Sequence, residues 1–457
     1  MAEKGKKGRL KVQTFVGDSY IPIDNATIRI RPSFGDGTQR QDIVISTNSM
    51  GETEEVELDA PPLEYSQAPL GQVPYSMYDI RIDREGFESI IINRCQVFPD
   101  QTAIQPANMI EVSPLIDINR NRFFERAEII NIGPNVLNGN YPPKIPEEEE
   151  KPLPPPTSGV VLPEPVIPEF IIVHAGGPNN ANAPNYRVRY KDYIKNVASC
   201  EIYSTWPENT IRANVYAIIS FTLNRIYTEW YRGKGKNFQI TNSTAYDHAF
   251  IYGRNYYDSI SRVVDDIFAT YIKRFNSKQP LLAQYCDGQN VQCPGWMTQW
   301  GSKYLGDEGK TPYEILTTFY GNNIELVRAE EVEGIPESYP GFELTIGSSG
   351  PPVRTIQEQL NRIADNYPLI PKVAVDGVFG DRTAEAVRVF QGVFNLPRTG
   401  VVDYATWYEI SNIYVGVTRI AELRGDKKTI DRIFIPPRSF DNLYDPNVPK
   451  FRYKDEI

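Results

Sequence analysis

The stretch that decides the fold of the central part of this chain is residues 193–214, which read YIKNVASCEIYSTWPENTIRAN. After Trp206, apolar side chains recur at the spacing of one helix face, which predicts a long amphipathic helix. A helix of this kind needs a core on one side, so the stretch belongs to a folded domain. The apolar face would carry Ile211, Val215, Ile218, Ile219, Ile226 and Trp230.

Two carboxylates in this stretch have different expected roles. Thr205 precedes Glu208 by three positions, a spacing typical of a capping box, and Pro207 suits the first turn of a helix. Glu208 therefore has a structural role, whereas Glu201 has none. We expect Glu201 near the helix start, where neighbouring aromatic side chains would shield the carboxyl and hold its pKa near neutrality. Glu201 is the candidate general acid, and Glu208 is the second candidate or the helix cap.

Length and hydrophobic pattern predict a multidomain protein, because 457 residues exceed a single typical core. We expect an N-terminal antiparallel β-sandwich, a Pro/Glu-rich linker, a central α+β domain, a small helical C-terminal domain and a tail. The expected bounds are 1–132, 133–169, 170–335, 336–424 and 425–457, respectively.

The linker is predicted from composition. Prolines accumulate between residues 133 and 168, together with an acidic run at 147–150 and a triple proline at 154–156. Such a segment buries little apolar surface, so we expect it to be extended and open to proteases. Either a cut there would separate the β-sandwich from the rest of the chain, or the linker is a passive spacer.

The regular elements of the two later domains follow from periodicity and turn residues. A helix beginning at Pro312 is expected to be capped by Thr311. For the central domain the pattern further predicts strands at 170–174 and 279–285 and a helix at 259–275, and for the C-terminal domain helices at 353–367 and 383–394.

Charge and composition exclude several partners and cofactors. The net charge of −10 argues against nucleic acid, and no stretch approaches the roughly 20 apolar residues that span a bilayer. The first residues lack the apolar core of a signal peptide, so synthesis without one is expected. Metal sites usually need four ligands, and the chain has only four cysteines and two histidines, so no metal or other cofactor is expected. His248 is expected to be a structural histidine, and a disulfide, a metal pair or free thiols all remain open for Cys286 and Cys293.

The C-terminal helical domain carries an ordered motif between residues 376 and 407. It resembles the three-helix peptidoglycan-binding domains found on many wall hydrolases. The resemblance implies binding to peptidoglycan, although turn and helix-start residues of this kind are structural as much as ligand-binding. The motif residues are Asp376, Gly377, Phe379, Gly380, Thr383, Phe390 and Gln391.

The central domain resembles the SpoIID/LytB-type lytic transglycosylase domain. The resemblance is carried by residues 192–194, 200–201, 207–214, 296–301 and 309–320. It places Glu201 on the catalytic glutamate of that family. Two departures are visible: Ile219 stands where the family has an arginine, and the segment from Cys286 to Cys293 replaces a Gly-Gly-Thr loop. Aromatic and amide side chains are the expected walls of a glycan cleft, and the candidates are Tyr203, Trp206, Trp296, Gln299 and Trp300.

Taken along its length, the chain is similar to the spore cortex-lytic enzymes of anaerobic spore formers, and residues 1–132 resemble CnaB-like or carboxypeptidase-regulatory-like domains. The resemblance implies a lytic transglycosylase of spore cortex peptidoglycan, located in the cortex or coat region. It also implies a zymogen whose partner is an activating germination protease. Two alternatives stay open: a noncatalytic cortex- or coat-binding protein, and an N-acetylmuramoyl-L-alanine amidase.

Overall fold

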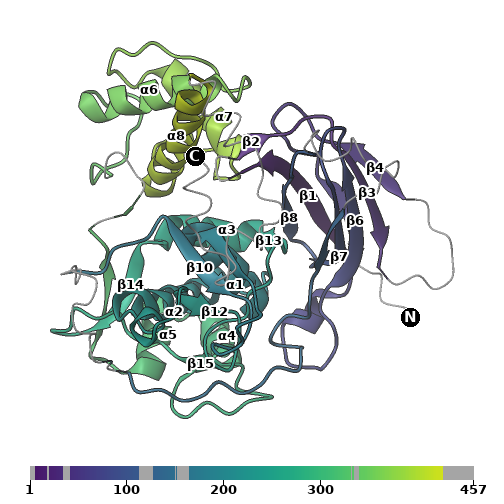
Figure 1. Cartoon of the computed structure of the whole chain (residues 1–457). Coiled ribbons are helices and arrows are strands. Elements are labelled where there is room, and N and C mark those ends of the chain that lie inside the picture. The colour runs from purple at the N-terminus through teal and green to yellow at the C-terminus, as the bar shows by residue number, and fades with distance from the viewer. Residues whose placement is uncertain are drawn as a thin grey trace.

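A computed structural model describes residues 6–17, 20–33, 42–112, 127–149, 151, 164–330, 332–333 and 339–425. It is a multidomain mixed α/β structure with a helical C-terminal region (Figure 1). The predicted tail, residues 425–457, lies outside the described residues except for its first residue. The same holds for residues 152–163 of the predicted linker.

The N-terminal unit consists of strands whose side chains alternate between core and solvent. In β1, for example, Leu10 and Val12 are buried while the residues between them are more exposed. Two five-stranded sheets form among the described residues, one around β1 and one in the order β4-β3-β6-β7-β9. The elements are β1 Lys6–Val16, β2 Ile21–Pro22, β3 Thr27–Pro32, β4 Ile43–Ser46, β5 Val56–Ala60, the 3₁₀ helix η1 Leu63–Ser66, β6 Ser76–Asp83, β7 Ser89–Val97, β8 Thr102–Asn108 and β9 Ala127–Asn131.

The prediction that these strands are all antiparallel is wrong. β1 pairs in parallel with β8, and β7 pairs in parallel with β9. Parallel neighbours need long connections, and here the chain between β1 and β8 passes through the other sheet before it returns. Strand alternation alone does not specify pairing direction, which explains the error.

The central domain is built around α2, which crosses its interior. Polar residues such as Ser220, Asn224 and Arg225 are buried on this helix along with the apolar ones, so α2 is enclosed on most sides instead of being amphipathic as predicted. The elements are β10 Phe170–His174, β11 Asn185–Arg189, α1 Tyr190–Glu201, α2 Glu208–Tyr227, η3 Arg232–Lys234, β12 Ile240–Thr241, β13 Tyr256–Tyr257, α3 Asp258–Ile267, β14 Thr270–Arg274, β15 Tyr285–Cys286, β16 Met297–Thr298, α4 Gln299–Asp307, α5 Pro312–Tyr320 and β17 Ile324–Arg328.

Some element predictions hold in this domain and others do not. The strand at 170–174 is confirmed, and Thr311 caps α5 through a full capping box with Glu314. The helix predicted for 259–275 is wrong in its second half, because α3 ends at Ile267 and β14 pairs with β17. The strand predicted at 279–285 is reduced to β15 at its end.

The N-terminal unit and the central domain share one sheet. β13 of the central domain pairs antiparallel with β8, which extends the sheet around β1 (Figure 1). Phe98 lies in the same junction, with its ring 5.4 Å from that of Tyr203 and 5.2 Å from that of Tyr257. The two units therefore bury a common apolar surface.

Residues 133–149, the longest described part of the predicted linker, pack against the central domain and are not free. Asn135 is fully buried, and Glu147 pairs with the buried Arg225. The expectation that this segment is open to proteases is wrong for residues 133–149, because prolines limit a segment's own hydrogen bonding but leave its other groups able to pair with a neighbouring surface. The consequences for Glu201 are described below.

The C-terminal unit contains three helices: α6 Pro351–Ala364, α7 Asp381–Val393 and α8 Tyr404–Gly425. The first two lie close to the bounds predicted for them, and the unit buries Phe379, Phe390 and Trp407 in a common core. Within the described ranges, no helix has the length and apolar character needed to cross a membrane.

Candidate active site

Glu201 is the last residue of α1 and lies ahead of α2, which begins at Glu208. A short connection containing Tyr203 and Trp206 separates it from α2. Its side chain is buried, with the residue 3% exposed. The sequence stretch therefore places a carboxyl inside the protein, at the junction of two helices.

Hydrogen bonds hold both oxygens of this carboxyl. The amide of Ala249 donates to Oε1 over 2.8 Å, and Nε2 of Gln299 donates to Oε2 over 3.1 Å. The same Nε2 also donates to the backbone carbonyl of Glu201 over 3.0 Å, which fixes Gln299 on the end of α1. Burial raises the pKa of Glu201, and the positive charge of Lys144 and these hydrogen bonds oppose part of that increase.

A small pocket, with a cavity volume of about 40 Å³, opens in front of Glu201. Four separate parts of the chain join Glu201 in forming its wall: residues 136–144 before the central domain, residues 244–247, β15 with the loop that follows it, and the start of α4. Among the residues that line it are Tyr141, Lys144, Tyr285, Asp287, Asn290 and Gln299.

Two other carboxylates reach this pocket, and both are already engaged. Asp247 accepts from Arg225 Nε over 2.7 Å and from the Tyr231 hydroxyl over 2.7 Å. Asp287 accepts backbone N–H groups of its own loop, including that of Val291 over 2.8 Å. Glu201 is thus the carboxyl in this pocket with a raised pKa and no cation in direct contact among the described residues.

Lys144 is a site residue that the sequence did not reveal. Its Nζ donates to the Asp247 carbonyl over 2.5 Å and lies over the rings of Phe221 and Tyr285, 4.5 and 4.6 Å from their centroids. The residue as a whole is partly exposed, and the ammonium end is its enclosed part. Burial lowers the pKa of Lys144 to about 8, although Glu201 and Asp247 favour the charged form. Its place in a proline-rich segment gave no signal of this role.

Tyr285 is a second site residue that sequence reasoning missed, and it pairs with His248. The Tyr285 hydroxyl lies 2.7 Å from Nδ1 of His248 and also interacts with the Glu201 carboxyl. Burial lowers the pKa of His248 well below its usual value, with Lys144 adding to the effect, so its imidazole is neutral. His248 is a hydrogen-bonded structural residue as expected, and it orients the tyrosine beside the acid.

The aromatic candidates for the cleft wall lie mainly in packed interior. Tyr203, Trp206 and Trp300 are buried against one another, with ring centroids 5.1 to 5.9 Å apart. Nε1 of Trp206 donates to the carbonyl of Ser66 in the N-terminal unit over 2.9 Å. Trp296 is partly exposed just before β16. Of the predicted wall residues, Gln299 lines the Glu201 pocket and these four do not.

Glu208 does not have the predicted capping role. It is the first residue of α2, its side chain is 69% exposed, and it pairs with Arg212 over 2.8 Å. The Thr205 hydroxyl donates to Ser66 instead of capping α2, because the N-terminal unit supplies a competing partner. Glu208 therefore lies on the surface, away from the pocket.

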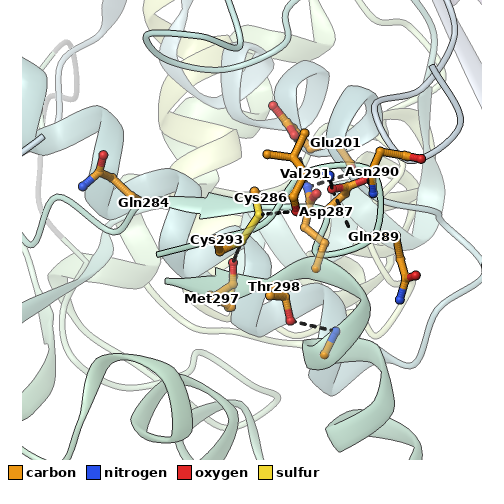
Figure 2. The surroundings of a disulfide bond; sticks show 12 residues. Glu201, Gln284, Cys286, Asp287, Gln289, Asn290, Val291, Cys293, Met297 and Thr298 are labelled. Atoms are coloured by element: carbon orange, nitrogen blue, oxygen red, sulfur yellow. Dashed lines mark hydrogen bonds between the residues drawn. A yellow bond between two sulfur atoms is a disulfide. The ribbon is translucent and has the colours of Figure 1, made fainter. Parts of the chain in front are cut away.

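Cys286 and Cys293 form a disulfide that closes the loop beside the pocket (Figure 2). Figure 2 also shows Asp287 inside this loop and Glu201 near it. Among the residues that the structure describes, no group of three or more histidine, cysteine or acidic side chains could hold a metal ion.

The motif residues of the C-terminal unit hold its fold. Gly377 donates to the Gln357 side chain over 2.8 Å, and Gln357 Nε2 in turn donates to Asp376 and Thr383. Gln391 repeats this arrangement with Gly400, Thr399 and Thr406. Phe379 and Phe390 are fully buried, and Gly380 precedes α7 as its N-cap.

Comparison with known proteins supports the assignment of this unit. Residues 349–410 match the family described as "Putative peptidoglycan binding domain". The match covers α6, α7 and the beginning of α8, and it supports a cell-wall-associated function for the chain. No curated protein matches the chain.

Two solved structures have weak similarity to part of the chain. A 3-chlorocatechol 1,2-dioxygenase from Rhodococcus opacus 1CP is 14% identical over 24% of this chain and 62% of its own, with a TM-score of 0.17. A catechol 1,2-dioxygenase from Acinetobacter sp. ADP1, inhibited by bound mercury, is 14% identical over 28% of this chain and 59% of its own, with a TM-score of 0.18. The chain thus spans about three fifths of each, and TM-scores this low carry no argument about fold or function.

Proposed function

We propose that this chain is a peptidoglycan lytic transglycosylase that cleaves the bond between N-acetylmuramic acid and N-acetylglucosamine. The observation that carries the proposal is Glu201: a buried carboxyl with a raised pKa, facing a pocket whose other carboxylates are engaged. The peptidoglycan-binding unit would bring this pocket to its polymer. The likeness of residues 192–320 to SpoIID/LytB-type domains supports the same assignment.

The reaction needs one acid. Protonated Glu201 donates its proton to the glycosidic oxygen, and the bond between that oxygen and C1 of the muramic residue breaks. The resulting carboxylate then takes the proton of the C6 hydroxyl of the same muramic residue. The O6 oxygen of that hydroxyl bonds to C1. The product is a 1,6-anhydro ring, and no water is consumed. Hydrolysis by the usual glycosidase route would need a second free carboxylate.

Gln299 fits a role in holding the sugar. Its Oε1 is buried without a hydrogen-bond partner among the described residues, while its Nε2 holds Glu201. Buried carbonyl oxygens are normally paired, so this one is suited to accept the N–H of an acetamido group. Gln299 would thereby place an N-acetyl sugar beside the acid.

Regulation by proteolysis is the second part of the proposal. The overall organisation resembles that of the spore cortex-lytic enzyme SleC, so we infer a zymogen in the spore cortex or coat region that a germination protease activates. The intact mass of the protein in dormant and germinated spores tests this inference. A full-length chain that persists unchanged in germinated spores would contradict it.

Substitution of Glu201 tests the chemistry. Glu201→Gln should reduce release of anhydromuropeptides from purified cortex by about 100-fold or more, because it removes the general acid. Both variant and unsubstituted protein are first cleaved within residues 150–163 and separated from the N-terminal fragment, and products are identified by mass spectrometry. Glu208→Gln is the matched control and should keep full activity.

The products also separate the alternatives. Reducing muramic ends would indicate hydrolysis, and free stem peptides would indicate an amidase. Binding to cortex without any product would indicate a noncatalytic wall protein. An active Glu201→Gln variant would exclude Glu201 as the acid.

A further inference from the structure

Residues 133–149 cross the Glu201 pocket from one side to the other. At the first end, Asn135 Nδ2 donates to the carbonyls of Ser199 and Ile202 over 3.2 and 3.1 Å. The amide of Val136 donates to the carbonyl of Cys200 over 2.9 Å. These acceptors flank Glu201 in the chain, so this end is attached directly at the acid.

The other end is attached by a buried ion pair. Glu147 binds Arg225 through two parallel contacts, Oε1 to Nη2 at 2.6 Å and Oε2 to Nη1 at 2.9 Å. The side chain of Arg225 is completely buried and is also held by Asp247. The Gln284 side chain bonds both the amide and the carbonyl of Glu147. A bidentate ion pair between an arginine and a carboxylate is a strong and geometrically specific interaction.

Between these attachments, the segment fills the front of the pocket. Tyr141, Pro142 and Lys144 form part of its wall, and the Lys144 ammonium group faces the Glu201 carboxyl across it. A glycan strand that reaches Glu201 needs this space. A cation in this position also favours the ionised carboxyl, whereas the proposed reaction begins from the protonated one.

We propose that residues 133–149 form an inhibitory strap that occupies the glycan site, with Lys144 as its contact with the catalytic pocket and Glu147 as its anchor. This inference rests on the proposed function, since it assigns the inhibitory element of the same site. The strap continues directly from β9, so it belongs with the N-terminal unit. A cut beyond Lys151 leaves all of these contacts in place, and activation then requires that the strap be displaced as well as cut.

The test uses the full, uncleaved chain with Glu147→Ala, Lys144→Met and the control Glu148→Ala, whose side chain is exposed. Glu147→Ala should release the strap, seen as faster hydrogen exchange in residues 134–149. It should raise anhydromuropeptide release by about tenfold or more, because apparent affinity rises with the fraction of open sites. Lys144→Met should also raise anhydromuropeptide release, and Glu148→Ala should leave this release unchanged.

A binding measurement keeps the strap testable without catalysis. In the Glu201→Gln background, Glu147→Ala should bind a peptide-free cortex glycan fragment about tenfold more tightly than the single variant. Equal affinity, despite faster exchange in the strap, would overturn the inference. If affinity rises but the full Glu147→Ala chain, which keeps Glu201, releases no anhydro product, the strap stands and the proposed reaction fails.

Discussion

At the scale of single residues, the proton affinity of Glu201 results from opposing effects. Burial raises its pKa, while Lys144, the Ala249 amide and the Gln299 amide favour the charged form. Because the proposed reaction starts with a protonated acid, activity should fall as pH rises through the pKa of Glu201. Each neighbour that stabilises the carboxylate therefore moves this fall to lower pH.

Gln299→Leu tests this balance. The substitution removes the Nε2 donor to Oε2 of Glu201, so the pKa of the carboxyl should rise. The alkaline limb of the pH–rate profile, measured from pH 4 to 9 on cleaved protein separated from the N-terminal fragment, should move to higher pH. The loss of the proposed acetamido contact should raise KM as well. An unchanged limb with a raised KM would leave Gln299 a role in binding only.

Glu201 could be proposed as the acid from sequence, but its surroundings could not be predicted. Glu201 stands in a local motif whose residues are adjacent in the chain. Lys144 and Tyr285 come from segments far from it and meet it through tertiary packing, which no local pattern encodes. The capping prediction for Glu208 failed for the same reason, since a distant partner, Ser66, binds the expected cap.

At the scale of elements, the C-terminal unit uses one hydrogen-bond arrangement twice. Gln357 on α6 and Gln391 on α7 each accept from a glycine amide and donate to two side-chain oxygens. Gly377 and Gly400 both have φ of 73°, a conformation that favours glycine. These turns are readable in the sequence as Gly-containing motifs, which explains why this unit was predicted best.

Two substitutions on α6 compare the loss of the Gln357 hydrogen bonds with the loss of a buried glutamine that lacks them. Gln357→Leu should destabilise the unit by about 1–3 kcal/mol, because the Gly377 amide loses its buried acceptor. Gln359→Leu is the matched control, since Gln359 is equally buried but its Oε1 has no partner among the described residues. Thermal unfolding measures both. If Gln357→Leu weakened peptidoglycan binding without lowering stability, Gln357 would contact the ligand instead.

At the scale of the whole molecule, the N-terminal and central units are joined by several kinds of contact. They share the β8–β13 pairing, the Phe98 aromatic junction and the strap. The sequence separated them because composition changes sharply at the proline-rich segment. The composition of a segment indicates which hydrogen bonds it can form within itself. It does not indicate which surface the segment packs against, so the junction could not be predicted from the sequence.

Phe98→Ala tests whether these units unfold together. Removing a fully buried ring from the junction should cost about 3–5 kcal/mol and lower one cooperative transition that includes both units. Phe379→Ala, which removes an equally buried ring from the C-terminal unit, should lower the transition of that unit. Scanning calorimetry, with hydrogen exchange to assign each transition, distinguishes the two variants.

The same junction governs what happens after proteolysis. A chain cut within residues 150–163 should elute as one complex, because the sheet pairing and the Phe98 contacts survive the cut. In the cut Phe98→Ala chain these contacts are weaker, so the N-terminal fragment should dissociate and activity should rise in parallel. If the fragments of the unsubstituted chain separate at once after cleavage, the shared sheet contributes little to association. The cut would then be sufficient for activation.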